Sequence, residues 1–175
     1  MMMRRSISLL TIALFMFALM FVCVSCGDDD DDDNDNTQQE EIVGKWLSSG
    51  DDVSVLLASL GFVSIGAQFN ENNTYTVDAT DNQGAVTQFV GTYVVAKSSV
   101  GNIYTITLSQ SSPTVLTSEG IYEIDSSTDP DEMMYEIVQT SPDIGATPPT
   151  PDGGFGSTNG GALGDMNVQK YIRIE

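Results

Sequence analysis

Hydrophobic and polar positions divide the chain into three stretches of different character. Residues 7–24 are almost wholly apolar, residues 28–41 contain no apolar side chain, and beyond them apolar and polar positions alternate. Alternation with a period of two is typical of half-buried β-strands, whereas a polar, acidic run cannot bury enough surface to fold. The pattern therefore predicts an apolar leader at 1–25, a flexible tether at 26–41 and one folded β domain at 42–175.

Within the domain, eight apolar-alternating segments are separated by turn residues. The predicted strands are 42–47, 62–69, 74–80, 85–96, 102–109, 117–124, 133–138 and 167–174. Gly91, inside the long fourth strand, is expected to mark a bend or bulge. Short turns between consecutive strands favour an up-and-down order, and eight strands are enough to close a barrel. We therefore predict an all-β fold: an eight-stranded antiparallel up-and-down barrel.

One segment after the first strand follows a helical spacing instead. Its apolar positions are Val53, Leu56, Leu57 and Leu60. This spacing places the four side chains on one face of a helix. We predict a short helix here, N-capped by an aspartate of the pair 51–52 and ended by Gly61.

The composition excludes most catalytic chemistry. The chain has no histidine, and its two cysteines, Cys23 and Cys26, both lie beside the apolar run. Histidine-dependent triads and histidine zinc sites are therefore excluded. Asp129, Asp131 and Glu132 cluster in one loop, but their spacing lacks the glycine and the terminal glutamate of a calcium-binding EF-hand. We predict a protein that is not an enzyme and has no cofactor or metal site.

Charge narrows the possible partners further. The whole chain has a net charge of −19. Once the leader is removed, four basic residues remain against 25 acidic ones, which leaves a net charge near −21. Such a chain repels phosphate backbones, so nucleic acid is excluded as a partner.

The leader has the layout of a secretory signal peptide. Arg4 and Arg5 precede the apolar run, and small residues follow it. The run is also long enough to be a single membrane-spanning helix. Val24-Ser25-Cys26-Gly27 resembles the lipobox of bacterial lipoproteins, although Cys23 occupies the place where that pattern has an aliphatic residue. The resemblance implies cleavage before Cys26 and attachment of a diacylglyceryl group and an N-acyl chain to this cysteine, which would anchor the protein to a membrane.

Six aspartates, Asp28 to Asp33, follow the predicted lipidation site directly. They resemble the surface-export signal of lipoproteins in some Gram-negative bacteria. This resemblance implies an outer-membrane lipoprotein that faces the cell exterior. An early aspartate in other lineages implies retention at the inner membrane.

Several short motifs in the domain resemble the lipocalin-like lipoproteins of Gram-negative bacteria. These are Ile42-Val43-Gly44-Lys45-Trp46, Phe69-Asn70, Thr74-Tyr75 and Gly91-Thr92-Tyr93. The resemblance covers about the first half of the domain. It implies that Gly44 and Trp46 form the Gly-x-Trp pair that closes one end of a lipocalin-like barrel. The C-terminal helix usual in that family is absent, since the chain ends on Ile172-Arg173-Ile174-Glu175.

Aromatic side chains are the strongest candidates for a binding site. Those expected to point into the barrel are Trp46, Tyr75, Tyr104, Tyr122 and Tyr135. They can form an ordinary packed core or line a cavity for a small hydrophobic molecule. The second possibility predicts a lipocalin-like binding domain. The first predicts a structural or interaction domain, such as an accessory subunit of an outer-membrane complex.

A long segment rich in glycine and proline, 141–166, does not fit a minimal barrel. Loops of this length without secondary structure are usually functional or disordered. The sequence leaves two interpretations: a mobile loop, or a lid in which Phe155 and Leu163 cover one mouth of the barrel.

Overall fold

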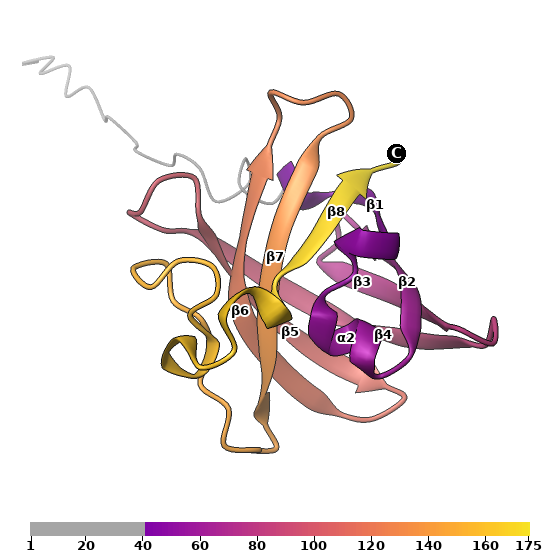
Figure 1. Cartoon of the computed structure of the whole chain (residues 1–175). Helices are drawn as coiled ribbons and strands as arrows, with labels where there is room; N and C mark the ends of the chain where they lie inside the picture. Colours follow the sequence, from indigo (N-terminus) through magenta and orange to yellow (C-terminus); the bar gives the residue numbers. More distant parts are fainter. Residues whose placement is uncertain (1–40) are drawn as a thin grey trace, which may run out of the picture. The chain divides into compact units, whose positions relative to one another are not determined.

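A computed structural model describes residues 41–175, which form a closed antiparallel barrel (Figure 1). Each strand pairs with the next along the chain, and the last pairs with the first. The strands are β1 (Gly44–Ser49), β2 (Phe62–Phe69), β3 (Thr74–Asp81), β4 (Val86–Lys97), β5 (Tyr104–Ser112), β6 (Leu116–Asp125), β7 (Glu132–Ser141) and β8 (Gln169–Arg173). The predicted eight-stranded up-and-down barrel is thus confirmed. The predicted signal peptide, Cys26 and all of the tether except Glu41 lie outside the described residues.

Alternating burial explains why these segments are strands. On β5, for example, Tyr104, Ile106 and Leu108 are buried, while the residues between them are more exposed. The buried set faces the barrel interior, because successive side chains of a strand point to opposite faces. Among the described residues, no helix is long and apolar enough to cross a membrane.

The short helix after β1 is confirmed, but its predicted cap is wrong. Helix α2 spans Val55–Ser59, and the Oγ of Ser54 accepts a hydrogen bond of 3.3 Å from the backbone N–H of Leu57. The aspartates 51–52 instead lie in the 3₁₀ turn η1 (Gly50–Asp52). Serine and aspartate are about equally good N-cap residues. Ser54 is the cap because it directly precedes the first helical residue, whereas Asp51 and Asp52 lie further back in η1.

The start of the first strand also differs from the prediction. Ile42 belongs to a helical turn before β1 and is fully buried. Its carbonyl oxygen accepts a hydrogen bond of 2.8 Å from Nε1 of Trp46. An apolar residue can therefore precede a strand and still belong to the core, because this turn folds back over the end of the barrel.

Gly91 marks a β-bulge between β4 and β5, as predicted. A Cβ at this position would lie 2.1 Å from the carbonyl oxygen of Ser109. Only glycine lets the two backbones approach so closely.

One end of the barrel is closed around Trp46, which is fully buried. Arg173, its register partner on β8, places its guanidinium carbon 4.1 Å from the centre of the indole ring. Gly44 has a φ of +134°, and a Cβ there would lie 2.6 Å from the Arg173 guanidinium. The Gly-x-Trp spacing therefore has a local physical reason, since glycine makes room for the arginine that covers the tryptophan.

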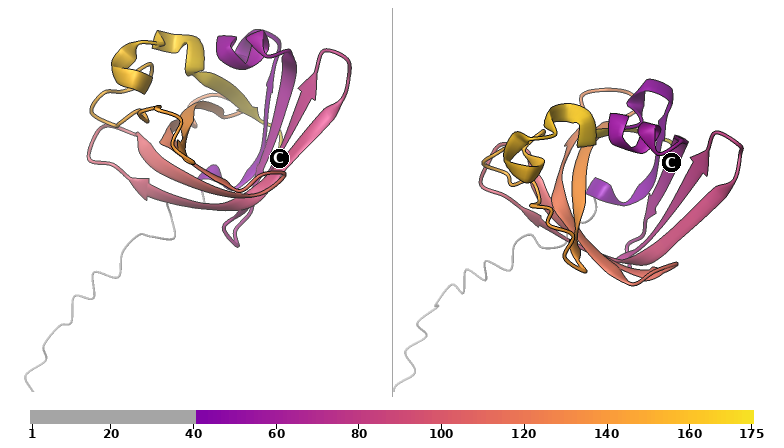
Figure 2. Two further views of the ribbon diagram at one scale, coloured as in Figure 1. Left: turned by 90° about the horizontal axis from the view of Figure 1, so that it is seen from below. Right: turned by 60° about the horizontal axis from the view of Figure 1, so that its bottom comes forward.

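The segment between β7 and β8 carries two 3₁₀ turns, η2 (Thr158–Gly161) and η3 (Gly164–Asn167). It packs on the outer face of β7 through Glu136, whose side chain is fully buried. The Glu136 carboxylate accepts hydrogen bonds from the backbone N–H of Gly156 at 2.7 Å, and from the backbone N–H at 3.2 Å and the hydroxyl of Thr158. Figure 2 shows this segment beside α2 at one rim of the barrel.

Candidate functional site: a cavity inside the barrel

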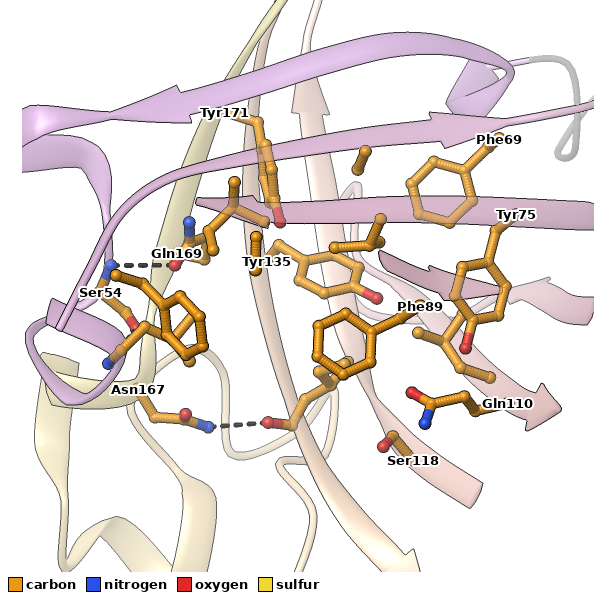
Figure 3. Close-up of a pocket in the computed structure, with 18 residues that line it drawn as sticks. Ser54, Phe69, Tyr75, Phe89, Gln110, Ser118, Tyr135, Asn167, Gln169 and Tyr171 are labelled. Carbon is orange, nitrogen blue, oxygen red and sulfur yellow. Dashed lines mark hydrogen bonds between the residues drawn. The ribbon is translucent and has the colours of Figure 1, made fainter. Parts of the chain in front are cut away.

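The barrel interior holds a cavity of about 250 Å³ (Figure 3). It is lined by residues of the strands β2 to β8, by Ser54 and Leu57 at α2, and by Asn167 of η3. The 18 lining residues are Ser54, Leu57, Phe62, Ile65, Ala67, Phe69, Tyr75, Val77, Ala79, Phe89, Leu108, Gln110, Ser118, Tyr135, Ile137, Asn167, Gln169 and Tyr171. A concave, mostly apolar site with a few polar groups is typical of small-molecule binding sites.

Aromatic rings dominate the middle of the cavity. Six of the lining residues are phenylalanine or tyrosine. Tyr135 and Tyr171 meet edge to face with ring centres 5.9 Å apart, and Phe69 and Tyr75 are tilted with centres 6.4 Å apart. Phe89 lines the same space as Tyr135 and Tyr75 (Figure 3). These rings offer flat apolar surfaces on several sides of the space they enclose.

Polar side chains lie at two places on the cavity wall. Near α2, the Oε1 of Gln169 accepts a hydrogen bond of 2.9 Å from the backbone N–H of Ser54. Asn167 donates one of 3.0 Å to the carbonyl oxygen of Ile137. On the opposite side, Gln110 donates one of 2.7 Å to the carbonyl oxygen of Thr114, which lies outside the lining.

One of these bonds, from Asn167 to Ile137, replaces strand pairing. β8 pairs with β7 only from Glu132 to Tyr135, so the rest of β7 has no neighbour from β8. The Asn167 amide satisfies the carbonyl of Ile137, the second residue past the end of that ladder. The part of β7 that lies beyond Tyr135 is therefore held in place by a hydrogen bond from the segment that precedes β8.

The cavity has no formal charge. None of the 18 described lining residues is aspartate, glutamate, lysine or arginine. Burial raises the pKa of the Tyr75 hydroxyl to about 12. Burial likewise raises the pKa of Tyr135 and of Tyr171. The tyrosines of the cavity are therefore neutral phenols at physiological pH.

The structure brings together two of the five aromatic residues named from the sequence. Tyr75 and Tyr135 line the cavity. Tyr104 and Tyr122 stack on each other with ring centres 5.0 Å apart outside the lining, and Trp46 is covered by Arg173. All five are buried, but they lie at different positions along the barrel axis, which the sequence did not predict.

Other lining residues were not named from the sequence. Gln169 and Tyr171 alternate on β8, and Gln110 continues the inward alternation of β5. Extending the predicted fifth strand beyond Ser109 would have placed Gln110 inside. Asn167 was predicted to begin the last strand, which is wrong: it ends η3, and β8 begins only at Gln169.

The mouth of the cavity is formed by different residues from those proposed for a lid. Leu57 of α2 and Asn167 of η3 line it, whereas Phe155 and Leu163 do not. Phe155 and Leu163 are half-buried elsewhere in the segment.

The acidic loop considered for calcium has another role. Asp131 accepts a hydrogen bond of 2.8 Å from Nε of Arg173. Among residues 41–175, no group of three or more carboxylates is placed so that it could hold a metal ion. The described residues form two other hollows, around Glu123 and around Asn70, whose linings contain carboxylates, whereas the lining of the barrel cavity is uncharged.

The closed eight-stranded barrel is compatible with a lipocalin-like fold. Barrels of this kind also occur in other families, so the architecture by itself does not assign one. No family model, curated protein or solved structure matches this chain.

Proposed function

We propose that this protein is a membrane-anchored lipoprotein, displayed on the outer face of the outer membrane, whose lipocalin-like barrel binds a small hydrophobic molecule. The observation that supports binding is the cavity of about 250 Å³ lined mainly by apolar and aromatic side chains. An engineered apolar cavity of about 150 Å³ is enough to hold benzene. The space therefore suits a molecule somewhat larger than a single ring.

A barrel that serves only as an interaction domain fits this interior less well. Protein cores are close-packed and keep few voids larger than a water molecule. An accessory subunit with no ligand gains nothing from a space of this size, since unfilled volume lowers stability. The cavity therefore favours binding over a purely structural role.

Filling the cavity is expected to abolish binding. Ala79 is 3% exposed and lines the space, so Ala79→Leu adds three carbon atoms inside it. Ala96→Leu is the matched control, because Ala96 is exposed on β4 and lies outside the cavity lining. Native mass spectrometry of the chain purified from cell membranes is expected to show one extra small mass on the wild type and on Ala96→Leu, but not on Ala79→Leu. Equal masses for the wild type and Ala79→Leu would argue against a ligand in the cavity.

Lipidation of Cys26 is tested separately. Cys26→Ser is expected to abolish incorporation of labelled palmitate and to leave the leader uncleaved, because the thiol is the acceptor of the diacylglyceryl group. Cys23→Ser is the control and is expected to leave labelling and cleavage intact. Attachment matters for location, since one acyl chain holds a protein only marginally and two or more hold it stably. Cleavage of the barrel by protease added to intact cells would then report display on the outer surface.

A further inference from the structure

Gln169 is a buried amide that uses only one of its two hydrogen-bonding ends, the carbonyl oxygen. The residue is 3% exposed and lines the cavity. Its Oε1 accepts the backbone N–H of Ser54. Because a backbone N–H can only donate, the carbonyl oxygen of the amide must face Ser54, and the orientation of the amide is thereby decided.

The other end of this amide is unsatisfied. Among residues 41–175, no atom accepts a hydrogen bond from Nε2 of Gln169. Buried side-chain donors are nearly always paired in native proteins. Gln169 lines the cavity, but its Nε2 has less than 1 Å² of accessible surface, so an acceptor on a ligand reaches this donor only when the side chain turns toward the space.

The other polar amides of the cavity are engaged differently. Gln110 donates through its Nε2 to Thr114, and Asn167 donates through its Nδ2 to Ile137. Of the three side-chain amides that line the cavity, all among the described residues, only Gln169 leaves its NH₂ group without a partner.

The remaining wall defines the rest of the ligand. No lining residue carries a formal charge, and an unpaired charge is very costly to bury. The six aromatic side chains favour a flat ring system, since aromatic pairs gain stability beyond the area they bury. Scaling from benzene in about 150 Å³, a cavity of about 250 Å³ accommodates about ten non-hydrogen atoms.

We propose that the cavity selects an uncharged aromatic molecule of about ten non-hydrogen atoms that carries a hydrogen-bond acceptor, and that Gln169 Nε2 donates to this acceptor. A carbonyl oxygen, an ether oxygen or a ring nitrogen meets this requirement. The proposal rests on the proposed function, that the barrel binds a small hydrophobic molecule, and adds the chemical class of that molecule.

Three probes of one shape test whether the cavity binds a small hydrophobic molecule at all, and whether it selects an uncharged one that carries a hydrogen-bond acceptor. Acetophenone has a carbonyl acceptor, α-methylstyrene replaces that oxygen with a CH₂ group, and benzoate adds a negative charge; all three have the same number of non-hydrogen atoms. Calorimetric titration is made on the chain purified from membranes in detergent. The quantity compared is the dissociation constant of α-methylstyrene divided by that of acetophenone. Loss of each probe to the detergent is the same for every variant, so it cancels when the ratios of two variants are compared.

Gln169→Met keeps the length of the side chain and removes the donor. We expect this substitution to lower the ratio about tenfold, which corresponds to one neutral hydrogen bond. Gln68→Met is the matched control: it removes an exposed amide on β2 that lies outside the cavity lining and donates to Asn70, and it is expected to leave the ratio unchanged. Benzoate is expected to bind no variant.

A measurement on the wild type is independent of whether Gln169→Met folds. The carbonyl stretch of isotope-labelled acetophenone is expected to move to lower frequency on binding than in hexane, as a carbonyl that accepts a hydrogen bond does. Binding of both neutral probes with an unchanged ratio and an unshifted stretch would overturn the role of Gln169 while leaving the proposed function intact. Tight binding of benzoate would overturn selection for an uncharged ligand. Failure of all three probes to bind would overturn both proposals.

Discussion

Replacing Trp46 with alanine is expected to lower the free energy of unfolding by about 3–5 kcal/mol. The indole is fully buried, donates to the carbonyl of Ile42 and is covered by Arg173. Removing it leaves a large void and takes away the surface on which the arginine rests. Typical domains are stable by only about 5–15 kcal/mol, so chemical denaturation monitored by circular dichroism is expected to show a barrel close to the limit of folding.

Trp46→Phe is the informative control for this prediction. The phenyl ring still fills much of the space beneath Arg173 but cannot donate to Ile42, so the expected loss is only about 1–2 kcal/mol. The guanidinium also donates to the carbonyl of Val43 at 2.7 Å and to that of Glu41 at 2.6 Å. It therefore ties the N-terminal turn to β8. Equal stability of Trp46→Ala and the wild type would mean that this end of the barrel does not depend on the tryptophan.

Replacing Glu136 with alanine is the second substitution with a large expected effect, about 3–5 kcal/mol of unfolding free energy. The carboxylate is fully buried and accepts three hydrogen bonds from Gly156 and Thr158. Without it, two backbone N–H groups and one hydroxyl lose their acceptor beneath the segment between β7 and β8. Its register partner on β6, Ile121, is also fully buried and would gain solvent exposure when that segment detaches.

Hydrogen exchange distinguishes local detachment from general destabilisation in this variant. The amides of Gly156 and Thr158 are expected to exchange much faster in Glu136→Ala, whereas those of β2 and β3 change less. Glu119→Ala is the control, because Glu119 is an exposed carboxylate on the neighbouring strand β6. Slow exchange at Gly156 together with wild-type stability would show that Glu136 does not hold this segment.

The strands were predictable because their signal is local. Alternation with a period of two decides which residues of a strand face inward, and in an antiparallel barrel with short turns each strand pairs with the next. Phe62–Phe69 was therefore predicted to its last residue. β1 was misplaced at its start, since the burial of Ile42 depends on a hydrogen bond from Trp46 that no local pattern reveals.

The site was less predictable, because a cavity depends on depth along the barrel axis. Tyr122 and Tyr135 face each other in register on β6 and β7, yet only Tyr135 lines the cavity. Tyr122 instead stacks on Tyr104. Alternation predicts the inward face but not which inward side chains touch each other and which leave space between them.

By itself the sequence determined the all-β class, the number and order of the strands, the short helix and the absence of histidine-dependent chemistry. These follow from local periodicity, turn residues and composition. Only the tertiary structure decided the cover of Arg173 on Trp46, the attachment of the 142–168 segment through Glu136, and the pairing of Gln169 with Ser54. Each of these contacts joins residues at least 20 positions apart in the chain. Such contacts depend on strand register and closure, which the polar or apolar character of single positions does not specify.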